Sequence, residues 1–90
     1  NKAIELKPKY TVAYHNRGYA YGMKGQYDKA ISYYNKDLEI NPKDARLYNS
    51  LGKAYYQLND MQKSCENYQK ACDLGLCGEF KKAKEQGRCK

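Results

Sequence analysis

Four cysteines carry the most reactive side chains of this chain, and all lie in its last third, at Cys65, Cys72, Cys77 and Cys89. Their spacings do not include the Cys-x2-Cys pair of common zinc sites, and none of them precedes the histidine of a haem attachment site. The single histidine, His15, is far from them in the sequence. We therefore expect neither a metal site nor any other cofactor.

The spacing of the cysteines leaves two interpretations open. Cys65 and Cys72 are seven residues apart, so they share one face of a helix and could be small side chains of the core. Alternatively, the four cysteines form disulfides that fasten a thin C-terminal segment. If the last helix folds back along 61–74, Cys89 comes near Cys65, and Cys72 and Cys77 lie on either side of the turn. The sequence decides neither the pairing nor the compartment, because disulfides would imply the periplasm or secretion and free thiols fit the cytoplasm.

A catalytic arrangement is not evident from the residue types. His15 could act as a general base, but no motif places a nucleophile or a carboxylate beside it. The chain also lacks a glycine-rich phosphate-binding loop. We therefore expect no enzyme activity, and a histidine at the surface or in a groove.

Tyrosine and lysine dominate the remaining chemistry. The chain has eleven tyrosines, one phenylalanine and no tryptophan, and its formal net charge is +7. Tyrosines can stack on RNA bases, but tyrosines that recur at fixed positions are more typical of helix–helix packing. The lysines are spread along the chain, as on solvated helix faces, and they concentrate only at the end: Lys81, Lys82, Lys84, Arg88 and Lys90. Nucleic-acid binding is therefore not expected, and no apolar run is long enough to span a membrane.

The elements that position these residues are indicated by an internal repeat. Shifting the chain by 34 positions aligns several identical residues. The aligned pairs are Tyr14 with Tyr48, Gly18 with Gly52, Ala20 with Ala54, Tyr21 with Tyr55, Lys29 with Lys63, Tyr34 with Tyr68 and Lys36 with Lys70. We assign the chain to one domain with four parts: 1–8, the end of a preceding repeat; 11–44, repeat 1; 45–78, repeat 2; and 79–90, a capping helix and tail.

Each repeat is predicted to contain two amphipathic helices. The expected ranges are 10–23, 27–40, 44–57 and 61–74, with a short last helix over 78–87. Gly22 and Gly25 mark the end of the first helix, and Asn41-Pro42 ends the second. Asp44 is placed to cap the third. Because the connections are short, neighbouring helices should be antiparallel.

These residues carry a resemblance to a known family. The pattern Tyr14, Gly18, Tyr21, Ala30, Tyr34 and Pro42 resembles the tetratricopeptide repeat, and the second unit gives Tyr48, Leu51, Gly52, Tyr55, Ser64, Tyr68 and Ala71. The resemblance implies an all-α fold of antiparallel helical hairpins, stacked as a right-handed superhelix (an α-solenoid) with a C-terminal capping helix. It also implies a scaffold that binds protein or peptide partners.

Three positions depart from the family pattern. Arg17 replaces the usual leucine, and Asp37 stands where the family prefers alanine. Leu76 or Cys77 occupies the place of the proline that would close the second repeat. The last departure suggests that the repeat array ends here, with 78–87 as its cap.

The resemblance further implies that the first helix of each repeat lines a concave peptide-binding groove. The corresponding residues are Val12, His15, Asn16, Tyr19 and Met23 in repeat 1, and Arg46, Asn49, Ser50, Lys53 and Gln57 in repeat 2. Some family members hold a free C-terminal carboxylate with one asparagine and two basic residues. Asn16 and Arg46 fit two of those places but Ser50 replaces the second base, so we expect a looser site for an acidic or polar peptide.

Two other interpretations of this surface remain. The ten residues could be ordinary exposed polar side chains. The chain could also self-associate, since it begins inside a hairpin and would expose apolar residues around Ile4, Leu6 and Tyr14.

Overall fold

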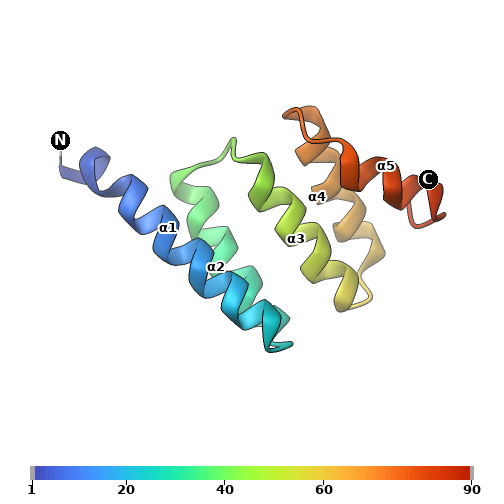
Figure 1. Ribbon diagram of the computed structural model, residues 1–90, viewed down its shortest axis with the longest axis horizontal. Coiled ribbons are helices and arrows are strands. Elements are labelled where there is room, and N and C mark those ends of the chain that lie inside the picture. Colours follow the sequence, from blue (N-terminus) through green and yellow to red (C-terminus); the bar gives the residue numbers. More distant parts are fainter. Residues whose placement is uncertain (1, 90) are drawn as a thin grey trace. The chain divides into compact units, whose positions relative to one another are not determined.

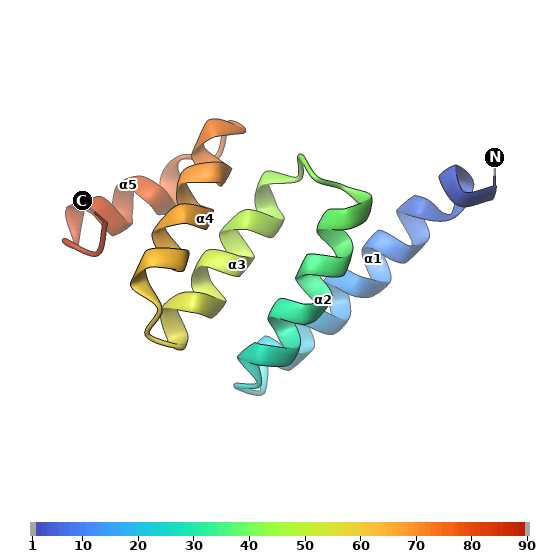
Figure 2. The ribbon, with the colours of Figure 1, turned by 180° about the vertical axis from the view of Figure 1, so that it is seen from behind.

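The described part of the chain folds into five helices. The computed structural model describes the backbone of residues 2–89 and the side chains of residues 13–89. Within that part the helices are α1 Lys2–Met23, α2 Tyr27–Ile40, α3 Ala45–Gln57, α4 Met61–Asp73 and α5 Gly78–Glu85, and no strand occurs. Helices α1 and α2 run antiparallel, as do α3 and α4 (Figures 1 and 2). The prediction of an all-α fold of antiparallel helical hairpins is confirmed.

The chain divides into two compact units. Unit 1 spans Asn1–Pro42 and contains α1 and α2, and unit 2 spans Lys43–Lys90 and contains α3, α4 and α5. Each unit is therefore one helical hairpin, to which unit 2 adds the short α5.

Helix α1 differs from its prediction at its beginning. It starts at Lys2, whereas the repeat pattern predicted a helix over 10–23 and assigned 1–8 to an earlier repeat. The helix continues through Pro8, where the missing amide cannot donate to the carbonyl of Ile4. The repeat boundary itself stays a prediction, but the backbone of this segment is continuous with the first helix of repeat 1.

The turns inside the two hairpins occupy equivalent positions. Gly25 has a φ of 80° and Asn59, which is 34 residues later, has a φ of 64°. Both residues thus take the left-handed conformation that closes the first helix of a repeat, which glycine adopts freely and asparagine tolerates. The prediction that Gly25 ends α1 in a tight turn is confirmed.

Aspartate side chains begin α3 and α4. Asp44 accepts a hydrogen bond of 3.1 Å from the backbone N–H of Arg46, as predicted. Asp60 accepts one of the same length from the backbone N–H of Lys63, a cap that was not predicted from the sequence. Each carboxylate satisfies an amide that has no partner within its helix.

Glycine allows the two helices of each hairpin to approach closely. A Cβ added to Gly18 would lie 2.7 Å from the ring of Tyr34, and one added to Gly52 would lie 2.6 Å from the ring of Tyr68. Both rings are buried. The repeated glycine–tyrosine pair therefore sets the spacing of both hairpins, and Ser64 adds a 2.7 Å hydrogen bond from its hydroxyl to the carbonyl of Gly52.

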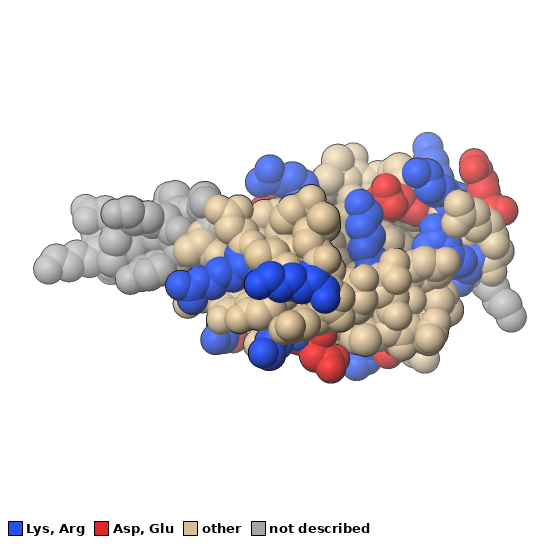
Figure 3. Space-filling view, turned by 60° about the horizontal axis from the view of Figure 1, so that its bottom comes forward, with Lys and Arg blue, Asp and Glu red and all other residues tan. Residues whose placement is uncertain are grey.

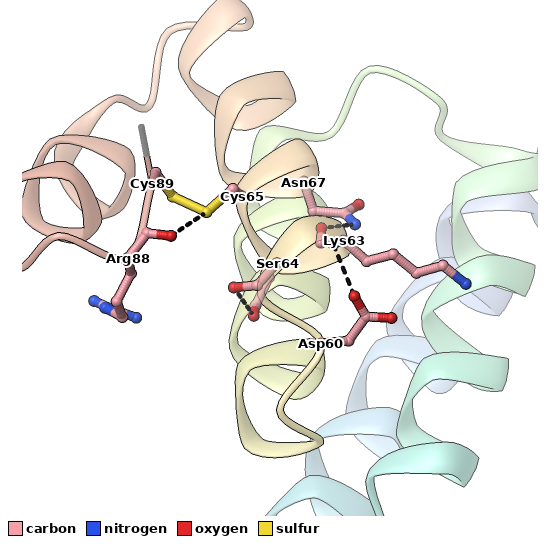
Figure 4. The surroundings of a disulfide bond; sticks show 8 residues. Asp60, Lys63, Ser64, Cys65, Asn67, Arg88 and Cys89 are labelled. Carbon is pink, nitrogen blue, oxygen red and sulfur yellow. Dashed lines mark hydrogen bonds between the residues drawn. A yellow bond between two sulfur atoms is a disulfide. The ribbon is translucent and has the colours of Figure 1, made fainter.

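The C-terminal segment packs on α4. Tyr68, Ala83 and Cys89 form a buried cluster, against which Cys65 and Phe80 are partly buried. The cysteines form two disulfides, Cys65–Cys89 and Cys72–Cys77, and no cysteine within the described residues is free. Figure 4 shows the first of them where the end of the chain meets α4. Helix α5 is present where a capping helix was expected, although its role as the end of an array stays a prediction.

Candidate peptide-binding surface

One face of α1 carries the predicted binding residues of repeat 1. Asn16, Tyr19 and Met23 recur at helical spacing, on a side different from that of Gly18, which contacts α2, and His15 lies between these two sides. Asn16 is exposed, and Tyr19 and Met23 are 59% and 72% exposed. The side chain of Val12 lies outside the described residues. This face therefore presents large apolar groups to water beside one amide.

His15 is the most enclosed of the described members of this set. It is half-buried, and its ring centroid is 5.8 Å from that of Tyr34 at a tilt of 46°. The ring is thus held against the hairpin by an aromatic contact. His15 therefore packs on Tyr34 and remains partly exposed at the candidate surface.

The equivalent face of α3 has a different chemistry. Arg46, Lys53 and Gln57 are exposed, whereas Asn49 and Ser50 are half-buried. The Nε of Arg46 lies 3.4 Å from Oδ1 of Asp44, but the Arg46 side chain is 79% exposed. Solvent weakens an ion pair of this kind, so the guanidinium retains the capacity to bind a second carboxylate.

Asn49 adds a buried acceptor to this face. Its Oδ1 is shielded from solvent and accepts no hydrogen bond from any residue that the structure describes. A buried polar atom without a partner is costly. The repeat periodicity gave no indication of this property.

The structure thus brings predicted residues together on one face within each unit, considered separately. In unit 1 it places Asn16, Tyr19 and Met23 on one exposed face of α1, and in unit 2 it places Arg46 and Lys53 on one exposed face of α3. The first face can bind apolar side chains and the second can bind carboxylates.

A pattern of lysine–tyrosine contacts was not recognised from the sequence. The Nζ of Lys29 lies 5.4 Å from the ring centroid of Tyr21, and the Nζ of Lys63 lies 5.5 Å from that of Tyr55. All four residues align at the 34-residue offset, which was the available signal. These cation–π contacts hold the tyrosines at the hairpin seams and keep the ammonium groups at the surface.

The remaining chemistry of the surface is dispersed. On the face in Figure 3, basic side chains are scattered among acidic and uncharged ones. The described part of the chain contains no group of three or more His, Cys, Asp or Glu residues that could hold a metal ion. Among the described residues, no helix combines the length and the hydropathy needed to cross a membrane.

Comparison with known protein families gives two matches. Residues 11–44 match one model of the tetratricopeptide repeat, and residues 45–74 match a second model of the same repeat. A search of curated proteins gives no match to the chain. The matched ranges contain both faces described above.

Proposed function

The chain belongs to the tetratricopeptide-repeat family, and we propose that it is a scaffold that binds a peptide segment of a partner protein on the first helices of its repeats. Repeats of this family generally mediate protein–protein interactions, and the family is typically not enzymatic. The proposal specifies which faces bind and which kind of peptide they favour.

The exposure of Tyr19 and Met23 is the observation that carries this proposal. Two large apolar side chains one helical turn apart are 59% and 72% exposed on the face that the family uses for ligands. Exposed apolar groups that gather on one face favour a binding role. We infer that an apolar side chain of the partner covers them.

The α3 face supports a preference for acidic peptides. Arg46 and Lys53 supply exposed positive charge for the carboxylates of such a peptide. Charge of one sign on a binding face increases the association rate and selects partners of the opposite sign. Ser50 stands where the family's carboxylate clamp has its second basic residue, so the proposal does not require a free C-terminal carboxylate on the partner.

A peptide array tests this proposal. The chain is applied to arrayed peptides that vary in acidic and apolar content, with Asn16→Ala and Arg46→Ala as variants. The exposed Asn35 on α2 gives a matched control, Asn35→Ala. We expect both groove variants to weaken the best peptides and the control to leave them unchanged. Unchanged binding by both groove variants would argue against this surface.

Self-association is the second candidate function. The same exposed Tyr19 and Met23, together with Leu74 and Leu76 at 42% and 41% exposure, could instead contact another copy of the chain. Light scattering over a range of concentrations separates the two functions. A strict monomer at all concentrations would eliminate self-association and leave peptide binding.

A further inference from the structure

A second flank of unit 1 carries basic side chains around two stacked tyrosines. We call it the basic tyrosine flank, and it consists of Arg17 and Tyr21 on α1, Lys24 directly after the end of α1, and Lys29, Tyr33 and Lys36 on α2. In each set of three the residues are spaced by four and then three positions, so the members within each helix lie on one side. On α1 this side differs from the one that presents Asn16, Tyr19 and Met23.

The two tyrosines form the centre of this flank. Their ring centroids are 5.5 Å apart and their planes differ by 9°. The Nζ of Lys29 lies 5.4 Å from the Tyr21 centroid, and the Nζ of Lys36 lies 5.4 Å from that of Tyr33. A hollow of about 260 Å³ opens beside the rings, lined by Arg17, Ala20, Tyr21, Lys24 and Tyr33.

The charge on this flank is unbalanced. All four cations are exposed, and none forms an ion pair with an acidic residue in the described part of the chain. Lys29 and Lys36 rest over tyrosine rings, but Arg17 and Lys24 have no such contact among the described residues. Arg17 also replaces the leucine of the family pattern, which exchanges an apolar contact for a planar charged donor group.

We propose that the basic tyrosine flank binds an acidic peptide segment of a protein partner. Carboxylates of the segment pair with Arg17 and Lys24, and one of its apolar side chains enters the hollow against Tyr21 and Tyr33. An arginine guanidinium can hold a carboxylate through two parallel hydrogen bonds. The hollow is smaller than the usual site of a cofactor or a drug-sized ligand, and it matches a single side chain better.

A protein segment fits this flank better than a nucleic acid. Single-stranded nucleic acids bind through bases that stack on free aromatic faces. Tyr21 and Tyr33 already stack on each other, and each carries a lysine ammonium. The flank therefore offers charge and an apolar hollow but little ring surface for a base.

Peptide binding by charge-changing variants tests the proposal. The probe is an acetylated and amidated nonapeptide of alternating glutamate and leucine, and its match has glutamine in place of glutamate. Arg17→Leu and Lys24→Gln remove one charge each, and Lys81→Gln removes one from exposed α5 as a control. We expect each flank variant to weaken the glutamate peptide about tenfold, and the Lys81→Gln control to leave it unchanged. The glutamine peptide should not bind.

Three results would overturn the proposal. One is an equal loss of affinity in Lys81→Gln, which would indicate attraction by net charge alone. Another is equal binding of the glutamine peptide. The third is tighter binding of a thymidine oligonucleotide that is lost in Arg17→Leu and Lys24→Gln, which would assign the flank to nucleic acid. Circular dichroism of every variant verifies that the helices are retained.

Discussion

At the scale of single residues, the glycine–tyrosine pairs determine how closely the helices pack. Gly18 faces the ring of Tyr34 and Gly52 faces the ring of Tyr68, at distances that leave no space for a methyl group. A helical glycine costs about 1 kcal/mol relative to alanine. The close contact with a buried ring explains why glycine occurs at both positions despite its lower helix propensity.

Replacement of Gly52 by alanine should therefore destabilise unit 2. The new Cβ would lie 2.6 Å from two ring atoms of Tyr68, so the ring or the helices must move. Overpacking of this kind outweighs the gain in helix propensity, and we expect a net loss of about 1–2 kcal/mol in the free energy of unfolding. Urea unfolding followed by circular dichroism measures this loss.

Gly78 provides the matched control for this substitution. It lies in α5, and an added Cβ there would meet no atom within 4 Å. Gly78→Ala should leave stability unchanged or raise it by about 0.5–1 kcal/mol. If Gly52→Ala were as stable as Gly78→Ala, the glycine would not set the helix spacing.

Tyr68 should ionise at unusually high pH. Burial raises the pKa of Tyr68 above 10.0, and the negative charge of Glu79 raises it further. A hydrogen bond from Arg88 and the positive charge of Arg88 oppose this shift. An unfolded chain loses this proton near pH 10, while the folded chain retains it. Stability is therefore fully present below pH 10 and decreases as the pH rises from 10 towards the folded pKa. Ultraviolet titration of tyrosine ionisation in the wild type and in Tyr68→Phe measures this shift in pKa. Identical ionisation of the two proteins above pH 10 would contradict it.

At the scale of helices, the sequence predicted most of the fold. The range 27–40 agrees with α2, and Asp44 caps α3 as expected, because apolar periodicity, proline and an N-cap residue act locally. The beginning of α1 was not predicted, since Pro8 normally interrupts a helix. The Tyr21–Tyr33 stack was missed because Asn67 occupies the position equivalent to Tyr33, so the repeat comparison did not single it out.

The candidate site was predictable to a similar degree. Helical spacing gave the faces on α1 and α3, because a period of 3.6 residues decides which side chains share a side. The buried Oδ1 of Asn49 and the contact between His15 and Tyr34 depend on the surrounding side chains. A repeat pattern carries no information on such contacts.

The two disulfides should contribute unequally to the stability of the C-terminal cap. Cys65–Cys89 joins residues 24 positions apart, and Cys72–Cys77 joins residues 5 positions apart. Loop entropy gives about 3.5 kcal/mol for the first and about 2 kcal/mol for the second. Cys65→Ala with Cys89→Ala should therefore lower the thermal midpoint more than Cys72→Ala with Cys77→Ala.

Thiol counting provides the control for this comparison. Under denaturing conditions without reductant, the native chain should show no free thiol and each double variant should also show none. Four free thiols in the native chain would contradict the disulfides. Equal thermal midpoints for the two double variants would contradict the loop-length argument.

At the scale of the whole molecule, the chain combines two hairpins of one family with different surfaces. The α1 face of unit 1 is apolar at Tyr19 and Met23, whereas the α3 face of unit 2 is cationic at Arg46 and Lys53. Among the residues that the structure describes, only unit 2 carries an additional helix and disulfides. A partner that combines apolar and acidic side chains would match both faces, and its affinity should fall with added salt.

Nuclear magnetic resonance mapping of the binding surface tests the central claim most directly. The chain, labelled with ¹⁵N, is titrated with the peptide that the array selects, and the shift of each backbone amide is followed. We predict the largest shifts around Asn16 and Tyr19 in α1 and around Arg46 and Lys53 in α3, with small shifts in α4 and α5. Shifts confined to α2, α4 and α5, with α1 and α3 unchanged, would contradict a binding surface on the first helices of the repeats.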